Sequence, residues 1–398
     1  MQANKLDMPI YLDYAATTPA DPQVIDVMLS CLGSTGCYGN PSSSNHVIGR
    51  VARERVEAAR AEIATLIGAN PEEIIFTSGA TESDNLALSG VLSRAGPGSH
   101  LVTDRIEHKA VIDTARVLEA RGHPLTWLTP GHDGRISPEA LIAAIRPDTA
   151  LVSIMHVNNE IGVIQEIATL GKICRERGVL FHVDAAQSVG KVPIDLSNLA
   201  VDLMSFSGHK VYGPKGIGAL FVRDSPAVNL DALIHGGGHE RGLRSGTLAT
   251  HQIVGMGRAF SLAGKYFEHD VAHAQQLSRR LEQGLKRLGG VRINGPDEVH
   301  RSPFILNLSF NGVITDSLFY FLTDVAVSTG SACSSASHEP SYVLKALGYD
   351  DIRARGSLRL SLGRFTTEAE IDRAVEHIGA AVERLRKLAP SEFKVNCR

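Results

Sequence analysis

Two segments of the chain place acidic, basic and hydroxyl side chains directly after apolar runs. "HVDAAQ" places Asp184 at the end of an apolar run and Gln187 three residues later. "SFSGHKVYGPKG" places Ser207, His209 and Lys210 after a second apolar run. Taken singly, each is more often a turn former or a solvated side chain than a catalytic group. Together they meet the needs of pyridoxal phosphate, which takes a lysine for its Schiff base and an acidic partner for its pyridine nitrogen.

A phosphate site is the third requirement of such a cofactor. "TSGATESDN", residues 77–85, could supply one with backbone amides and hydroxyls at the start of a helix. Other glycine-rich stretches fit less well, since "GHKVYGPK" lacks the Lys-Ser/Thr ending of a phosphate loop and "GPKGIG" lacks dinucleotide spacing. Three glycines separate His235 from His239, which argues against a shared metal ion. We expect no resident metal.

One thiol lies in an unusual setting. "STGSACSSASHEPS", residues 328–341, surrounds Cys333 with small residues. This composition predicts a reachable side chain in a mobile loop, suited to a reactive or sulfur-carrying role. A serine-rich surface loop with an incidental cysteine is the alternative that the segment alone leaves open.

The composition of the chain is ordinary for a globular protein, and its length is typical of an enzyme. Of 398 residues, 43% are hydrophobic and 21% charged, and the net charge of −3 gives no basic field for nucleic acid or an anionic membrane. No apolar run reaches the length of a membrane span, and the first residues lack a signal-peptide pattern. Five scattered cysteines without a Cys-x-x-Cys pair predict reduced thiols, with neither a disulfide scaffold nor a structural zinc site. We expect a cytoplasmic protein.

The order of predicted elements indicates an α/β fold. From about residue 50 to 260, short apolar runs alternate with helical segments such as 107–121, 138–146 and 167–177, which predicts a mainly parallel sheet covered by helices on both faces. Ligands bind at the carboxyl ends of such strands. The runs are "EEIIFTSG", "HLVTD", "LTWLTP", "TALVSIMHV", "VLFHVDAA", "LMSFSG" and "GALFV".

The pattern of predicted elements changes after residue 262. A long polar helix is predicted at about 264–288, two strand-like segments flank the Cys333 loop, and Thr367 with Glu370 has the spacing of a capping box before the last helix. We therefore expect a large cofactor-binding domain, 16–262, and a smaller α+β domain made of 1–15 and 263–398 that carries the Cys333 loop.

The motifs taken together resemble those of cysteine desulfurases, in the class-V aminotransferase family, of the housekeeping type that supplies sulfur for iron–sulfur clusters. The resemblance runs from "YLDYAATTP" to "LRKLAP", essentially the whole chain. It is carried by "FTSGATESDN", "HVNNEIG", "HVDAAQSVGK", "SFSGHKVYGPKG", "GGGHERGLRSGT", "GSACSSAS" and "SLRLSLGRFTT". It implies fold type I of the pyridoxal-phosphate-dependent transferases.

The resemblance also implies roles for individual residues toward pyridoxal phosphate. Lys210 would form the Schiff base, Asp184 would pair with the pyridine nitrogen, and Gln187 with the phenolic oxygen. His108, in "EHKAV", would stack on the ring and help to move protons. The residues expected to hold the phosphate and complete the cofactor site are Ala80, Thr81, Asn159, Ser207 and His209, with Thr247 from a partner subunit.

Substrate and partners follow from the same resemblance. Arg359 would grip the carboxylate of L-cysteine in a bidentate manner, assisted by Asn159 and Asn40. Cys333 would take the sulfur as a persulfide and leave alanine, with Cys397 as the rival thiol. We expect a homodimer that passes sulfur to an iron–sulfur scaffold protein or to other acceptors, such as carriers for tRNA thiolation. Cys333 is a candidate transient ligand of an iron–sulfur cluster shared with the scaffold. We expect no direct binding of nucleic acid or membrane.

Other functions fit the motifs less well. A selenocysteine lyase or an aminotransferase on the same fold is the nearest alternative, although an aminotransferase needs no nucleophilic thiol. A catalytically idle interaction protein would not need Lys210, Asp184, His108, Cys333 and Arg359 together.

Overall fold

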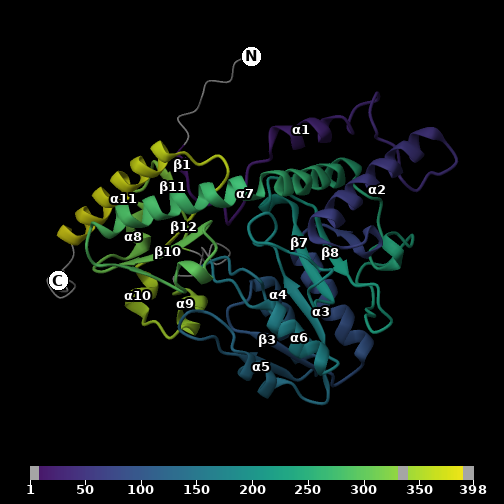
Figure 1. Cartoon of the computed structure of the whole chain (residues 1–398), viewed down its shortest axis with the longest axis horizontal. Coiled ribbons are helices and arrows are strands. Elements are labelled where there is room, and N and C mark those ends of the chain that lie inside the picture. The colour runs from purple at the N-terminus through teal and green to yellow at the C-terminus, as the bar shows by residue number, and fades with distance from the viewer. Residues whose placement is uncertain (1–8, 330–338, 389–398) are drawn as a thin grey trace.

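A seven-stranded sheet forms the centre of the protein (Figure 1). The computed structural model describes residues 9–329 and 339–388. The strand order is β2–β8–β7–β6–β5–β3–β4, and all neighbouring pairs are parallel except the two that involve β8. Every apolar run named above forms one strand, so the predicted mainly parallel sheet is confirmed. The strands are β2 (Ile74–Thr77), β3 (His100–Asp104), β4 (Leu125–Leu128), β5 (Thr149–Ser153), β6 (Leu180–Asp184), β7 (Leu203–Ser207) and β8 (Gly218–Val222).

Helices cover both faces of this sheet because successive side chains of each buried strand point to opposite faces. Phe76, Phe206 and Phe221 pack with α2, α6 and the first half of α7, whereas Ile75 and Leu220 pack with α3 and α4 on the other face. The helices around this sheet are α1 (Pro22–Leu29), α2 (Val47–Ile67), α3 (Ala80–Ala95), α4 (Lys109–Ala120), α5 (Pro138–Ala144), α6 (Ile167–Glu176) and α7 (Thr250–Lys286). The predicted stop of α2 is confirmed, since Gly68 caps it in the left-handed conformation.

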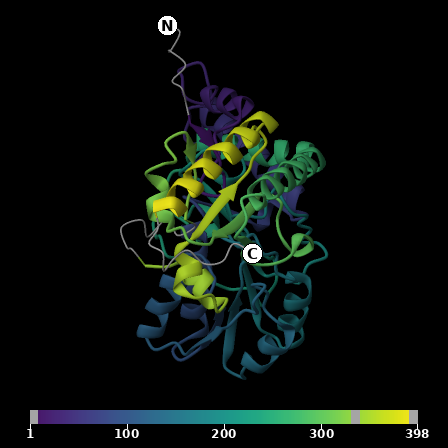
Figure 2. The same cartoon turned by 90° about the vertical axis from the view of Figure 1, so that its left-hand side faces the viewer.

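A smaller sheet lies beside the large one and has the order β12–β10–β9, all antiparallel. Its apolar side chains pack against α11 and the second half of α7, and Figure 2 shows α11 in yellow near the green α7. A parallel pair, β1 with β11, joins the same core. These elements are β1 (Ile10–Tyr11), β9 (Val291–Ile293), β10 (Ile305–Phe310), β11 (Val325–Ala326), β12 (Ser357–Ser361), α8 (Thr315–Phe319), α9 (Tyr342–Ala346), α10 (Asp351–Arg355) and α11 (Glu368–Leu388).

The starts of α11 and α7 differ in how well the sequence predicted them. The capping box of α11 is confirmed, because the Thr367 amide donates to Glu370 Oε2 at 2.8 Å and the Glu370 amide to Thr367 Oγ1 at 3.2 Å. The predicted start of the long helix near 264 was wrong, because α7 begins at Thr250. Its first half is apolar and packs on the large sheet, so only its second half has a polar texture. The predicted boundary after residue 262 falls inside α7, and the two-domain division stays a prediction.

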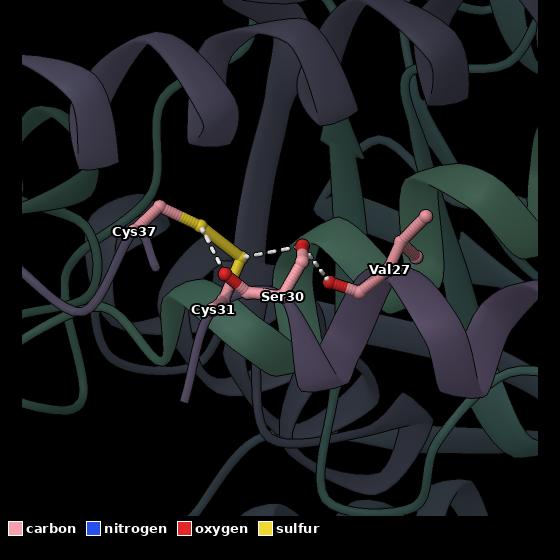
Figure 3. The surroundings of a disulfide bond; sticks show 4 residues. All are labelled: Val27, Ser30, Cys31 and Cys37. Atoms are coloured by element: carbon pink, nitrogen blue, oxygen red, sulfur yellow. Dashed lines mark hydrogen bonds between the residues drawn. A yellow bond between two sulfur atoms is a disulfide. The ribbon is translucent and has the colours of Figure 1, made fainter. Parts of the chain in front are cut away.

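The expectation that all cysteines are reduced was wrong for one pair. Cys31 and Cys37 form a disulfide after the end of α1, with 4.3 Å between their Cα atoms (Figure 3). The chain turns back between them, since the Gly36 amide donates to Gly33 O and the Cys37 amide to Ser30 O. A search for Cys-x-x-Cys pairs overlooks this bond, because the two cysteines are six positions apart. Cys174, in α6, is a free buried thiol.

A buried ion pair anchors the segment that carries Thr247. Arg60 of α2 donates to both Glu240 carboxylate oxygens at 2.8 Å, and the Phe76 amide donates to Glu240 Oε2 at 2.7 Å. Glu240 and Arg241, in the short 3-10 helix η3 (Glu240–Gly242), have φ of 47° and 56°, in the region that side chains disfavour. Such a backbone persists only when its surroundings fix it, so the Arg60–Glu240 pair holds the shape of this segment.

We predict that Arg60→Met lowers the free energy of unfolding by roughly 3–5 kcal/mol, because it leaves the Glu240 carboxylate buried without its cation. Denaturant unfolding of the cofactor-free protein measures this. Arg280→Met is the matched control: Arg280 pairs with Asp372 in solvent, so its loss should matter far less. Equal effects of the two substitutions would contradict the anchoring role.

No helix within the described stretches combines the length and apolarity needed to cross a membrane.

Candidate active site

A cavity of about 460 Å³ opens where the predicted chemistry was expected, beyond the carboxyl ends of β6 and β7. The start of α3 closes one side, and β12 of the smaller sheet contributes to another. Both sheets therefore build this site. Ten of the residues predicted from the sequence line it: Ala80, Thr81, His108, Asn159, Asp184, Gln187, Ser207, His209, Lys210 and Arg359.

Lys210 reaches this cavity from the short 3-10 helix η2 (Gly208–Lys210), which follows β7 directly. Its Nζ donates to the carbonyl oxygens of Ala15 at 2.5 Å and Ala16 at 2.8 Å. These carbonyls belong to the "YLDYAATTP" segment, which thus fixes the direction of the lysine side chain. Burial, followed by the charges of Lys210 and other lysines, lowers the pKa of His209 to about 4, so its imidazole is neutral near pH 7.

Asp184 is a buried carboxylate at the end of β6. Its Oδ1 accepts the Ala186 amide at 2.8 Å, and only 4% of the residue is exposed. Burial raises the pKa of Asp184 above its usual value, although His108, the Ala186 amide and Lys210 each oppose this rise. Asp84 and Glu107 lie nearby and are fully buried; burial first, and the charge of the neighbouring carboxylates second, raises the pKa of each well above its usual value. The negative charge of this group is therefore most stable on Asp184, the member that faces His108 and Lys210.

A neutral histidine supports the sheet beneath Asp184. His182 precedes Asp184 by two residues on β6, so both side chains lie on the same face. Its ring nitrogens form hydrogen bonds with the hydroxyls of Ser153 at 2.8 Å and Ser205 at 2.9 Å, on the strands to either side. Burial lowers the pKa of His182 to about 3, so it adds no charge to the carboxyl group of Asp84, 3.7 Å away.

His108 lies at the start of α4 and faces the same cavity. Its Nδ1 accepts the Ala110 amide at 3.2 Å, which caps the helix. This contact assigns Nδ1 as an acceptor and leaves the other ring nitrogen to carry a proton. The ring is thereby held in one orientation at the edge of the cavity.

The beginning of α3 fits a phosphate group. Ala80 and Thr81 are in the first turn of this 16-residue helix, whose N-terminus carries a partial positive charge. Ser83 is tied to Thr77 by a 2.8 Å hydrogen bond, which fixes the turn. A Cβ built on Gly79 would meet no described atom within 4 Å, so open space lies in front of this helix end. Ser207 and His209 add polar side chains to the same cavity.

Arg359 projects from β12 and lines the cavity, and its Nε group has no hydrogen-bond partner among the described residues. It donates to Asp13 Oδ1 at 2.7 Å and to the carbonyl oxygen of Asn159 at 3.0 Å. Its Nε and the Oδ1 of Asn159 are both buried, and neither has a hydrogen-bond partner among the described residues. A buried polar atom without a partner costs about 1–3 kcal/mol, so this donor and this acceptor together indicate a polar ligand.

Two predicted residues do not line this cavity in the single chain. Asn40 lies between α1 and α2, where its Oδ1 accepts the Ser42 amide at 2.9 Å. Thr247 is exposed, in the segment that the Arg60–Glu240 pair anchors. Their predicted roles, Thr247 acting from a partner subunit, stay predictions.

Cys333 and Cys397 lie outside the described residues, but the chain on both sides of residues 330–338 is held at the cavity. The Arg359 amide donates to Ser328 O at 2.8 Å. On the far side, Ser341 donates to Glu160 Oε2 at 2.5 Å, and Tyr342 lines the cavity. The described residues on both sides of this segment therefore meet residues that line the cavity.

Sequence reasoning missed several residues that shape this site. The carbonyl oxygens of Ala15 and Ala16 accept hydrogen bonds from Lys210. Asp13 accepts a hydrogen bond from Arg359, and Glu160 and Tyr342 line the cavity. Asp13 and the two alanines belong to "YLDYAATTP", and Glu160 belongs to "HVNNEIG". Both motifs contributed to the family resemblance. A backbone carbonyl is present in every residue, so residue type could not point to Ala15 and Ala16. Asp13 and Arg359 are far apart in the chain, so no local spacing predicts their contact.

Comparison with known proteins gives the family. A model of the family "Aminotransferase class-V" matches residues 10–374, so the chain belongs to that family. Cysteine desulfurases IscS of Klebsiella pneumoniae subsp. pneumoniae and of Proteus mirabilis are each 57% identical over 386 residues, which cover 97% of this chain and 95% of each relative. The resemblance found in the motifs is therefore confirmed.

Solved structures agree with this membership. A NifS-like protein superposes with a TM-score of 0.88 at 36% identity, covering 95% of this chain and 100% of that one. SspA in complex with cysteine gives a TM-score of 0.79 at 40% identity, covering 90% and 99%. The predicted fold, fold type I of the pyridoxal-phosphate-dependent transferases, is confirmed.

The buried Glu160 predicts a pH dependence of stability. Burial raises its pKa from 4.5 to about 7, against the opposing effects of Ser341, Arg359 and His108. Between these two values the folded state binds more protons than the unfolded state, so the free energy of unfolding should fall as the pH rises from about 4.5 to about 7. Glu160→Gln should reduce that fall, as measured by urea unfolding of the cofactor-free protein at both ends of the window.

Glu119→Gln, on the exposed side of α4, is the control and should leave the fall unchanged. A Glu160→Gln protein with the same pH dependence as the wild type would show that Glu160 is ionised throughout.

Proposed function

We propose that this protein is a pyridoxal-phosphate-dependent cysteine desulfurase, which moves the sulfur of L-cysteine to Cys333 and releases L-alanine. The observation that carries the proposal is the meeting of Lys210 and Asp184, from the ends of adjacent strands, in one cavity with the unpaired Nε of Arg359. The 57% identity to cysteine desulfurases supports the same activity. SspA, a structural relative, was solved in complex with cysteine.

The residues present fit pyridoxal phosphate. Asp184 is the carboxylate suited to its pyridine nitrogen, Gln187 to its phenolic oxygen, and Lys210 to the covalent link. The start of α3, with Ser207 and His209, suits its phosphate. When bound, the cofactor supplies an electron sink for the α-carbon of an amino acid.

The chain's own residues then bind the substrate and move its protons. Arg359 and Asn159 supply the donor and acceptor that a substrate carboxylate and amino group can satisfy. Lys210 is the residue that we assign as the base for the α-proton, and its Nζ is oriented by the Ala15 and Ala16 carbonyls. His108 is the second group suited to hold a proton at this wall. Asp13 fixes the guanidinium of Arg359, so the carboxylate meets a rigid fork.

Sulfur transfer is the role we assign to Cys333. The thiolate attacks the sulfur of bound L-cysteine, so an S–S bond forms at Cys333 as the C–S bond of the substrate breaks. The substrate carbon keeps the electron pair and takes a proton, which gives alanine. No external oxidant is needed. The flanking described residues support this role, because Ser328 and Ser341 bond to Arg359 and Glu160 of the cavity wall.

The same proposal extends to partners and compartment. Exposed apolar side chains gather around α1 and the start of α2, and a face of this kind supports a symmetric homodimer in which Thr247 and Asn40 serve the neighbouring site. These side chains are Ile25, Leu29, Leu32, Tyr38, Val47 and Ile48. In this proposal, Cys333 passes the sulfur of its persulfide to an iron–sulfur scaffold protein or another sulfur acceptor. We place the enzyme in the cytoplasm, although the Cys31–Cys37 bond is of a kind that reducing compartments disfavour.

The test is turnover of L-cysteine by the protein loaded with pyridoxal phosphate. Cys333→Ala should keep the visible absorbance of the lysine-bound cofactor yet form at least a hundredfold less alanine, because no nucleophile remains to take the sulfur. Alanine formation and the intact mass of the protein measure the two halves of the reaction.

Cys397→Ala is the matched control, a second thiol outside the described residues, and should keep full turnover with the persulfide on Cys333. A persulfide on Cys397 with turnover intact in the Cys333→Ala protein would contradict the proposal.

A further inference from the structure

A second lysine is buried behind the cavity wall. Lys191 follows Gln187 by four residues, and only 8% of it is exposed. Its Nζ donates to Gln187 Oε1 at 3.0 Å. Gly190 makes this possible: it has a φ of 69°, and a Cβ there would lie 2.9 Å from the Cβ of Ala263. The turn therefore brings Lys191 back onto the side chain of Gln187.

A chain of hydrogen bonds connects this lysine to Lys210. Gln187 Nε2 donates to the carbonyl oxygen of Ala15 at 2.8 Å, and the same oxygen accepts Lys210 Nζ at 2.5 Å. Gln187 lines the active-site cavity, whereas Lys191 lines a second cavity of about 450 Å³ behind it. Contacts thus run from Lys191 through Gln187 and Ala15 to Lys210.

We propose that Lys191 is a positioning residue for the active site, which holds the oxygen of the Gln187 amide so that its N–H side faces Ala15 and the cofactor's ring oxygen. An amide has similar shape in both orientations, and only its partners decide which atom faces the cavity. With Oε1 occupied by Lys191, Gln187 is fixed as a donor. This inference rests on the proposed function, because it concerns the residues that meet pyridoxal phosphate.

The cost of burying Lys191 argues against a purely structural role. Burial, followed by the like charges of Lys210 and Arg359, lowers the pKa of Lys191 to about 7. In the second cavity, Glu282 is paired with Arg301 at 2.8 Å, and Glu298 with Arg279, so neither carboxylate is dedicated to Lys191. An apolar side chain of similar volume would pack there at lower cost. The contact with Gln187 accounts for the lysine.

The charged and titratable groups that face Lys191 come from several elements. They are His209 and Lys210 of η2, Arg359 of β12, Arg279 and Glu282 of α7, Glu298 of the 3-10 helix η4 (Glu298–His300), and Arg301.

The test is a double-mutant cycle on the colour of the lysine-bound cofactor. Lys191→Met should raise the pH midpoint of the visible absorbance by roughly one unit, a tenfold change in proton affinity, since it removes both a nearby positive charge and the contact that orients Gln187. Gln187→Ala should raise it similarly. The double variant should shift by less than the sum of the two single shifts, because the part of the Lys191 effect that acts through Gln187 is already lost in Gln187→Ala.

Lys172→Met, on the exposed side of α6, is the charge-matched control and should leave the midpoint unchanged. Should Lys191→Met fail to fold, Lys191→Gln removes the charge while keeping a polar side chain and serves in the same cycle. A midpoint equal to that of the wild type, or shifts that add in the double variant, would overturn the proposal.

The cycle also separates this inference from the proposed function. A wild-type protein that takes up pyridoxal phosphate but makes no alanine from L-cysteine contradicts the desulfurase activity, and the absorbance still decides the role of Lys191. A wild-type protein that takes up no pyridoxal phosphate overturns both.

Discussion

One buried negative charge, on Asp184 at the end of β6, constrains the centre of this protein. A carboxylate shielded from water is costly unless specific groups stabilise it. Here the stabilisation comes from the Ala186 amide, from His108 at the start of α4, and from Lys210 after the neighbouring strand. Asp84 and Glu107 avoid competing for the charge because burial favours their protonated forms. The site is therefore built to hold one anion facing cationic or proton-bearing groups.

The rest of the architecture serves to bring distant segments to this point. The parallel strands β6 and β7 end at the same edge of the sheet, so Asp184 and Lys210 become neighbours although 26 positions separate them. The "YLDYAATTP" segment crosses between the two sheets, where Asp13 binds Arg359 and Ala15 accepts from Gln187 and Lys210. α7 packs on both hydrophobic cores and so connects the two sheets.

The parts of the fold that depend on local pattern could be predicted from the sequence. Each strand of the large sheet is a short apolar run, and Gly68 and the Thr367–Glu370 pair mark helix ends by a local mechanism. Lys210 and Asp184 were singled out by their side-chain types and their places after apolar runs, whereas Arg359 was named only through the family resemblance. All three line one cavity.

What escaped prediction depends on contacts between remote segments or on backbone atoms. The first half of α7 is apolar on the side that packs on the large sheet. Its sequence therefore resembled the sheet region before it, and the polar second half alone was predicted as the long helix. The Cys31–Cys37 bond depends on a turn at Gly33 and Gly36, and the carbonyls of Ala15 and Ala16 have no counterpart in residue type. Lys191 was part of a noted motif, but only the structure relates it to Gln187.

The placement of the negative charge is the central claim, and the affinity for pyridoxal phosphate tests it most directly. Equilibrium binding should be measured for Asp184→Asn and Asp84→Asn, two substitutions of the same size and chemistry. The account predicts that Asp184→Asn weakens binding at least tenfold, since a charge-assisted hydrogen bond is lost. Asp84→Asn should stay within about threefold of the wild type, because a neutral amide replaces a neutral carboxylic acid. Equal losses in the two variants, or wild-type affinity in Asp184→Asn, would contradict it.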